Sequence, residues 1–412
     1  MIDWLRWILK PLASLKLTVA LFAMAMFLIF AGTLAQVEQG TFQAMDNFFR
    51  TWVAWVKLDY FVPQKALHVF ISKDMNELPG GFWFPGGITL ISLILINLVA
   101  AHSVRFKLKL KQTGILLTHA GLILLLGSEL VTGAFATEGN MRIREGSYSN
   151  YVERMRDYEL AVIKPAAGET GKNRTTVVPD SILLKHLEQN RGPISHPDLP
   201  FKIKVERWMN HTEFLNPRRG SNNPATAGFG RSVLAEAAPP PSGTDANQSY
   251  AIPSAYITLL KDGQSLGTYL VSAGIPRLLQ TSQPQKVEVD GTTYRISLRF
   301  RRVYKPFTMH LVDFTHAKFT GTETPKAFKS RIRLENPSRN ERREVLIQMN
   351  EPLHYQGQTF YQSGYMRDNK GTILQVVDNP AWLLPYISCA MIGGGLLVHF
   401  GITLVGFLRR QF

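Results

Sequence analysis

Four long apolar runs constrain this chain more than any other feature. Leu17 to Ala35 and Gly86 to Val104 contain no charged residue, Gln112 to Gly133 contains only Glu129, and Ala381 to Leu408 contains none. At 1.5 Å per residue each run is long enough to cross a hydrocarbon core of about 30 Å. We therefore expect transmembrane helices at 17–36, 86–104, 112–133 and 381–408, with the first retained as an uncleaved anchor.

Basic residues beside these runs predict the orientation. The charged residues of segments 1–16, 105–111 and 409–412 are all Lys or Arg, except Asp3. The segment 37–85 has nearly equal numbers of basic and acidic residues. The positive-inside rule then places both termini and the 105–111 loop in the cytoplasm, and 37–85 and 134–380 outside. Much of the net charge of +15 is thus a topological signal, which argues against a nucleic-acid partner.

The two outer segments differ in their patterns. Residues 41–57 space apolar side chains at helical intervals, which predicts a helix lying in the membrane interface. The segment 134–380 alternates apolar and polar residues and has Asp-Gly turns at 262–263 and 290–291, which predicts a large, mainly β domain. Residues 216–249 are rich in Asn, Gly, Ala and Pro, and we expect a flexible insert that divides this domain in two.

The expected fold class is a polytopic α-helical membrane protein with four transmembrane helices. A large, mainly β extracytoplasmic domain lies between the third and fourth helices. The chain has a single cysteine, Cys389, which falls within the fourth span. The composition therefore excludes a disulfide scaffold, a multi-cysteine zinc site and a haem-attachment motif within this chain.

Three histidines lie in or at the spans, where an ionisable side chain is costly and indicates function. His119 and His399 fall at similar depths, roughly 10 and 14 Å from the cytoplasmic ends of their helices. Two neutral imidazoles at matched depth are suited to axial ligation of haem iron. The alternative is that each makes one interhelical hydrogen bond. His102 lies at the cytoplasmic interface, where reaching toward water explains its position.

Several segments resemble ResB, a family of cytochrome c biogenesis proteins of the system II pathway. The resemblance is carried by LASLKLTVALFAMAMFLIFAGTLAQ in the first span, THAGLILLLGSEL in the third, FTMHLVDFTHAKFTGTETPKAFKS in the outer domain and, most specifically, NEPLHYQGQTFYQSGY. It extends over nearly the whole chain, except 216–249. A family histidine that looks like a haem ligand matches His119, while the role of His399 is less defined.

The resemblance implies a bacterial cytoplasmic (inner) membrane protein that acts with a multi-span partner of the CcsA/ResC type. Together they would handle haem b and support its covalent attachment to apocytochrome c outside the membrane, with this chain as a non-catalytic or co-catalytic subunit of a cytochrome c synthase. The alternative is a membrane-anchored scaffold for apocytochrome c that does not bind haem. A transmembrane sensor is disfavoured because the cytoplasmic segments are short.

The outer domain offers strand edges to an extended apocytochrome segment. Residues 350–365 are rich in tyrosine and glutamine, and Tyr355, Tyr361 and Tyr365 are the candidate contacts with this partner. The alternative is that these tyrosines pack within a sheet. The expected associations are therefore a CcsA/ResC-type protein, apocytochrome c and membrane lipid.

Overall fold

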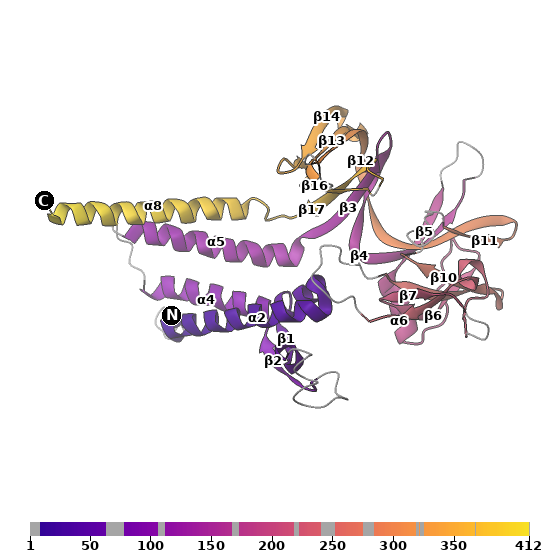
Figure 1. The fold of residues 1–412 in the computed structure, drawn as a ribbon, viewed down its shortest axis with the longest axis horizontal. Helices are drawn as coiled ribbons and strands as arrows, with labels where there is room; N and C mark the ends of the chain where they lie inside the picture. Colours follow the sequence, from indigo (N-terminus) through magenta and orange to yellow (C-terminus); the bar gives the residue numbers. More distant parts are fainter. Residues whose placement is uncertain are drawn as a thin grey trace. The chain divides into compact units, whose positions relative to one another are not determined.

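The chain folds into two compact units. A computed structural model describes residues 9–62, 78–105, 112–166, 173–217, 222–239, 252–274, 284–318, 321, 325–366 and 368–411. The first unit joins Met1–Thr137 to Asn379–Phe412, and the second joins Glu138–Pro241 to Ser249–Asp378 (Figure 1). Of the expected loop at 105–111, residues 106–111 lie outside the described residues.

Four apolar helices dominate the first unit. They are α2 (Leu15–Ala44), α4 (Gly87–Arg105), α5 (Thr113–Phe135) and α8 (Leu384–Gln411). Each is long and apolar enough to cross a membrane, and together they account for all four predicted spans. The helices lie side by side in the order α2, α4, α5, α8 (Figure 1).

One buried polar group joins α2 to α4. The Asn97 side chain donates to the carbonyl of Leu12 and accepts a 2.7 Å hydrogen bond from the hydroxyl of Thr18. Leu12 lies at the break before α2, where a helix end leaves carbonyls without intrahelical partners. Asn97 therefore satisfies backbone groups that would be costly to bury unpaired in an apolar environment.

The segment after α2 differs from the interfacial helix predicted at 41–57. Helix continues only through Ala44 and a π-helical turn, η1 (Met45–Phe49), and is followed by strand β1 (Val53–Lys57) and a 3-10 turn, η2 (Leu58–Phe61). β1 pairs antiparallel with β2 (Gly81–Pro85), so Trp55 lies opposite Trp83. Residues 53–57 alternate exposed and buried positions, which is the strand period, but the pairing partner is too distant in sequence for local spacing to reveal it.

The second unit is mainly β, as predicted. Its strands are β3 (Thr137–Arg144), β4 (Tyr148–Lys164), β5 (Arg174–Pro179), β6 (Lys202–Met209), β7 (Thr212–Leu215), β8 (Leu234–Ala237), β9 (Ser254–Lys261), β10 (Gln264–Ser272), β11 (Gln285–Val289), β12 (Thr292–Lys318), β13 (Pro325–Asn336), β14 (Glu341–Gln348), β15 (Leu353–Tyr355), β16 (Gln358–Tyr365) and β17 (Gly371–Asp378), with one helix, α6 (Asp180–Glu188).

The largest sheet in the described residues follows the order β14-β13-β12-β4-β3-β17-β16-β15, with β11 on β12 and β5 on β4. A second sheet has the order β10-β9-β6. The two predicted Asp-Gly turns are confirmed: Asp262, Gly263, Asp290 and Gly291 all have positive φ, as tight hairpin turns require.

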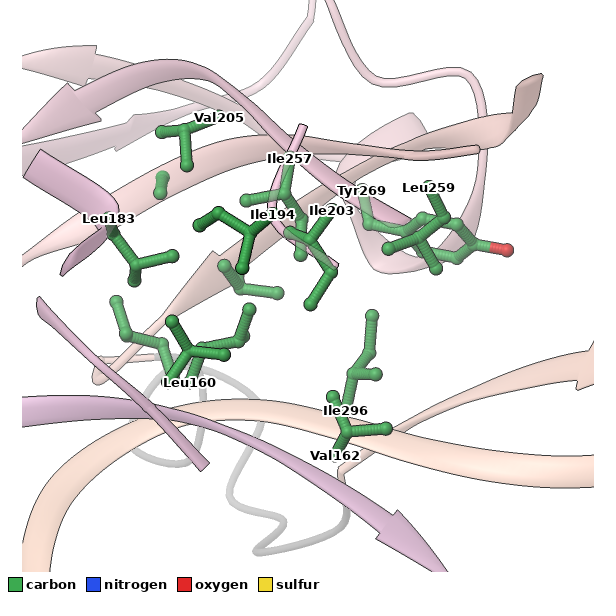
Figure 2. Packing of buried hydrophobic residues seen from close by; sticks show 14 of the residues in the cluster. Leu160, Val162, Leu183, Ile194, Ile203, Val205, Ile257, Leu259, Tyr269 and Ile296 are labelled. Atoms are coloured by element: carbon green, nitrogen blue, oxygen red, sulfur yellow. The ribbon is translucent and has the colours of Figure 1, made fainter. Parts of the chain in front are cut away.

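Two hydrophobic cores divide the β unit along its long strands. The first core packs Leu160 and Val162 of β4 and Ile296 of β12 against Ile203 and Ile257 of the three-stranded sheet (Figure 2). The second core uses the other half of β12. It contains Phe307, Met309, Leu311 and Phe314 together with side chains of β3, β13, β14, β16 and β17. The two cores thus lie on different halves of the long strands β4 and β12, and the 216–249 insert does not mark the division between them.

Part of that insert is ordered, which differs from the predicted flexible loop. Among residues 222–239 lie a 3-10 turn, η4 (Gly228–Arg231), and strand β8, which pairs with β7. Ala225 and Ala235 pack with Tyr256, whose hydroxyl accepts from the Ala235 amide at 2.9 Å. Small residues are typical of turns, but here two of them, Ala225 and Ala235, pack on the face of β9 that carries Tyr256. Residues 218–221 and 240–249 lie outside the described residues.

Candidate functional site

Two imidazole rings meet between the first unit's central helices. His102 of α4 and His119 of α5 have ring centroids 4.7 Å apart and an interplanar angle of 58°, and both side chains are half-buried. The sequence predicts that His102 reaches toward water at the membrane interface, and the structure adds a ring contact with His119. One feature of the sequence could have predicted this contact. His102 and His119 lie on either side of the short segment 106–111, and antiparallel helices joined by a short segment lie next to each other beside it.

Helical geometry explains why His119 meets α4. Gly114 and Gly121 of α5 lie against α8: a Cβ placed on Gly121 would approach the Ile392 side chain to 2.8 Å. His119 follows Gly114 by five residues, so it projects about 140° around the helix from that contact at 100° per residue. The glycine face and the histidine face of α5 therefore serve different neighbours.

His399 occupies a different environment. Its backbone lies against α5 so closely that a Cβ on Gly114 would overlap the His399 amide nitrogen. Its ring, half-buried, lies 5.7 Å from the ring of Phe400. The structure therefore brings the ring of His119 to His102, and the ring of His399 to Phe400 on its own helix. The two predicted haem ligands, His119 and His399, lie on the adjacent helices α5 and α8.

The three candidate tyrosines have distinct surroundings. Tyr355 is buried: it donates to Glu341 at 2.7 Å, accepts from Asn336 at 2.8 Å and packs edge-on against Phe307. Tyr365 packs against His316, with ring centroids 4.4 Å apart. Tyr361 is 40% exposed. Of the three, Tyr361 is the side chain most available to another protein.

Several ionisable groups of the β unit have pKa values shifted from their usual ones, among them Glu341, Tyr355 and Lys305. Hydrogen bonds from Tyr355 and Arg343 hold the pKa of Glu341 below its usual value, and burial raises the pKa of Tyr355. Burial lowers the pKa of Lys305, against the opposing attraction of Asp378. Within the described residues no group of three or more His, Cys, Asp or Glu side chains could hold a metal ion. The contact between His102 and His119 remains the candidate site among the apolar helices.

Comparison with known proteins identifies a family resemblance in the β unit. Residues 269–381 match the ResB-like family, which confirms the resemblance to ResB for this part of the chain. The match covers the end of β10 and all of β11 to β17, including all three candidate tyrosines. It does not reach α4, α5 or α8, so His102, His119 and His399 lie outside it.

A curated relative supports the same family. Protein NrfI of Wolinella succinogenes is 29% identical over 120 residues, which cover 29% of this chain and 13% of that protein. The chain thus matches only a small part of NrfI's length. Taken together, the family match and the relative support a role in cytochrome c biogenesis.

Proposed function

We propose that this chain is a subunit of a cytochrome c biogenesis machine in the bacterial cytoplasmic membrane. Four apolar helices would anchor it, with both termini in the cytoplasm and the β unit outside. With a CcsA/ResC-type partner it would handle haem b and support haem attachment to apocytochrome c. The observation that carries this proposal is the ResB-like match over residues 269–381.

His119 is the residue that we assign to haem iron. The residues fit the group: imidazole is an established iron ligand, and an imidazole among apolar helices is costly without such a function. The rings of His102 and His119, 4.7 Å apart, are in contact, which leaves no space for a porphyrin between them. His119 would thus supply one iron ligand, and a second would come from His399 or the partner. His102, packed on His119, would orient the ligand ring, as neighbours of metal ligands commonly do.

The chemistry of the attachment itself would come from haem and from the substrate. Haem supplies the vinyl groups that form thioethers with a cysteine pair of apocytochrome c. This chain contributes position, since holding reactants in a fixed geometry accelerates their reaction. Its one cysteine lies in α8, so its outer domain has no thiol that could form mixed disulfides with the substrate.

Absorption spectroscopy of the chain co-purified with its partner tests the ligand assignment. We expect His119→Ala to reduce haem occupancy at least tenfold or to change the ligand-dependent bands. His102→Phe keeps an aromatic ring against His119 and should retain haem with a smaller spectral change. His399→Ala shows whether the second ligand belongs to this chain. An unchanged spectrum and occupancy in His119→Ala would refute the assignment.

A second function, an apocytochrome scaffold that does not bind haem, is favoured by the exposure of Tyr361 in the family-matching segment. A photoreactive amino acid at position 361 should crosslink to an apocytochrome peptide, whereas the same group at the buried position 355 should not. Haem-free preparations that still crosslink would favour the scaffold. If no outer position gave a crosslink, the scaffold function would be rejected.

A further inference from the structure

The ribbon formed by β1 and β2, together with Trp52 just before it, exposes aromatic side chains that the rest of the described chain leaves open. Trp52 is 62% exposed, Trp55 41% and Trp83 68%. The Trp55 and Trp83 rings pack edge to face with centroids 4.9 Å apart. A Cβ on Gly81 would meet the Trp55 ring at 2.7 Å, so this glycine lets the indole lie close over β2. Exposed aromatic clusters of this kind mark interaction surfaces.

The opposite face of the ribbon packs on the flank of α2. Ala54 and Val56 are fully buried in one cluster with Leu28 and Ala31 of that helix. Phe84 of β2 lies 4.9 Å from Phe27, centroid to centroid. Phe27 stands within the charge-free run from 17 to 35. The ribbon therefore lies beside the apolar part of α2, instead of projecting beyond its end.

The base of the ribbon is fixed to the start of α4. The Gly86 amide donates to the Trp52 carbonyl at 2.9 Å, and the Thr89 hydroxyl donates to the same carbonyl at 2.6 Å. Gly86 and Gly87 lie so close to the backbone of Thr51 and Phe49 that a Cβ on either would overlap a carbonyl oxygen. The ribbon thus has a defined level relative to both helices, near their outer ends on the predicted topology.

We propose that this ribbon lies in the outer leaflet of the membrane, at the headgroup boundary, with Trp52, Trp55 and Trp83 facing lipid. The proposal rests on the proposed membrane insertion of α2 and α4. Indole suits this boundary because its ring is apolar while its N–H can bond to headgroups or water. Exposed apolar residues of α2, among them Met26 and Phe30, would face lipid on the helix that the ribbon packs against.

The depth follows from the ribbon's open edges. A two-stranded sheet leaves a row of backbone groups on each outer edge, and such groups cannot be left unsatisfied in the hydrocarbon core. At the boundary, water and headgroups can satisfy them while the indoles remain in apolar surroundings. We therefore expect the Trp side chains to lie about 5–10 Å into the interface, as in other interfacial elements.

Spin-label accessibility in liposomes of phosphatidylcholine and phosphatidylglycerol tests this depth. A nitroxide is attached at Trp83→Cys in a Cys389→Ser background, and its collision rates with oxygen and a water-soluble nickel chelate are compared. Leu397→Cys, on the exposed face of α8, is the lipid control, and Leu346→Cys, on β14, is the aqueous control. We expect an oxygen-to-nickel ratio at 83 several-fold above that at 346.

Each outcome has a separate meaning. A ratio at 83 equal to that at 346 places the ribbon in water, and shielding from both reagents places protein over it; either result overturns the proposal. A nickel-accessible label at 397 would instead refute membrane insertion, and with it the proposed function. Should Trp83→Cys not fold, brominated lipid provides the second measurement. Brominated lipid should quench a larger fraction of the tryptophan fluorescence in the wild type than in the triple variant Trp52→Phe/Trp55→Phe/Trp83→Phe. Equal quenched fractions in the two proteins would contradict the proposed position of the ribbon.

Discussion

At the residue scale, Tyr355 connects a buried core to a half-buried carboxylate. Its hydroxyl accepts from the buried Asn336 amide and donates to Glu341, while its ring fills the core beside Phe307. Removing the hydroxyl would leave the Asn336 amide without this partner, which costs about 1–3 kcal/mol for a buried group. Tyr355 is therefore primarily a stabilising residue in the family-matching segment.

The bond to Glu341 makes part of this stability depend on pH. The pKa of Glu341 is lowered in the folded protein, first by the Tyr355 hydrogen bond, so its contribution is fully present above the unfolded value of about 4.3. It is lost as the pH falls through the lowered, folded value. We expect the difference in thermal midpoint between wild type and Tyr355→Phe to be constant from pH 7 to about 5, and smaller below about 4.3. The Asn336 part should remain at every pH.

Glu344→Gln, on the same strand β14, is the matched control, and thermal unfolding in detergent at each pH is the measurement. The midpoint difference between wild type and this control should lack the decline linked to Tyr355. A Tyr355→Phe difference that stays the same down to pH 3 would show that the bond to Glu341 contributes nothing.

At the element scale, α5 and α8 depend on a seam of small residues. A Cβ on Gly395 would lie 2.6 Å from the Thr118 amide nitrogen and 2.8 Å from the Gly114 carbonyl oxygen. Both obstacles are backbone, which cannot move without separating the helices. Small residues at membrane helix interfaces permit this close approach.

Gly395→Ala should therefore destabilise the helix pair by about 1–3 kcal/mol, the usual effect of overpacking. Gly393 is the matched control on the same helix, because a Cβ there would meet nothing within 4 Å. Gly393→Ala should be neutral or stabilising by up to about 1 kcal/mol, since alanine favours helix more than glycine does. Thermal unfolding in detergent compares the two. Equal midpoints would mean that the seam is not closely packed.

How much the sequence could reveal also differs by element. The four apolar helices and the mainly β character of 134–380 follow from hydrophobic runs and alternation, which are local signals. The β1–β2 ribbon does not, because apolar spacing from Met45 to Trp52 fits a helix and the partner strand begins only at Gly81. The contact of His102 with His119 is likewise not predicted, because hydrophobic runs do not show which faces of α4 and α5 meet.

At the scale of the whole molecule, the proposed function depends on which side of the membrane the β unit and the basic flanks of the helices occupy. The proposed role in attaching haem to apocytochrome c requires the β unit outside and the basic flanks inside. Because the segment 105–111 has four basic residues, Arg105, Lys107, Lys109 and Lys111, and no acidic one, we expect it to remain in the cytoplasm.

A membrane-impermeant maleimide distinguishes the two orientations in intact spheroplasts. In a Cys389→Ser background, Leu346→Cys on β14 should react from outside, since its side chain is 52% exposed. Arg410→Cys, after the last apolar run, should react only once the membrane is opened. The reverse pattern would place the β unit in the cytoplasm, where it could not meet an apocytochrome on the outer side. Because neither variant changes a histidine, this result decides orientation independently of haem binding.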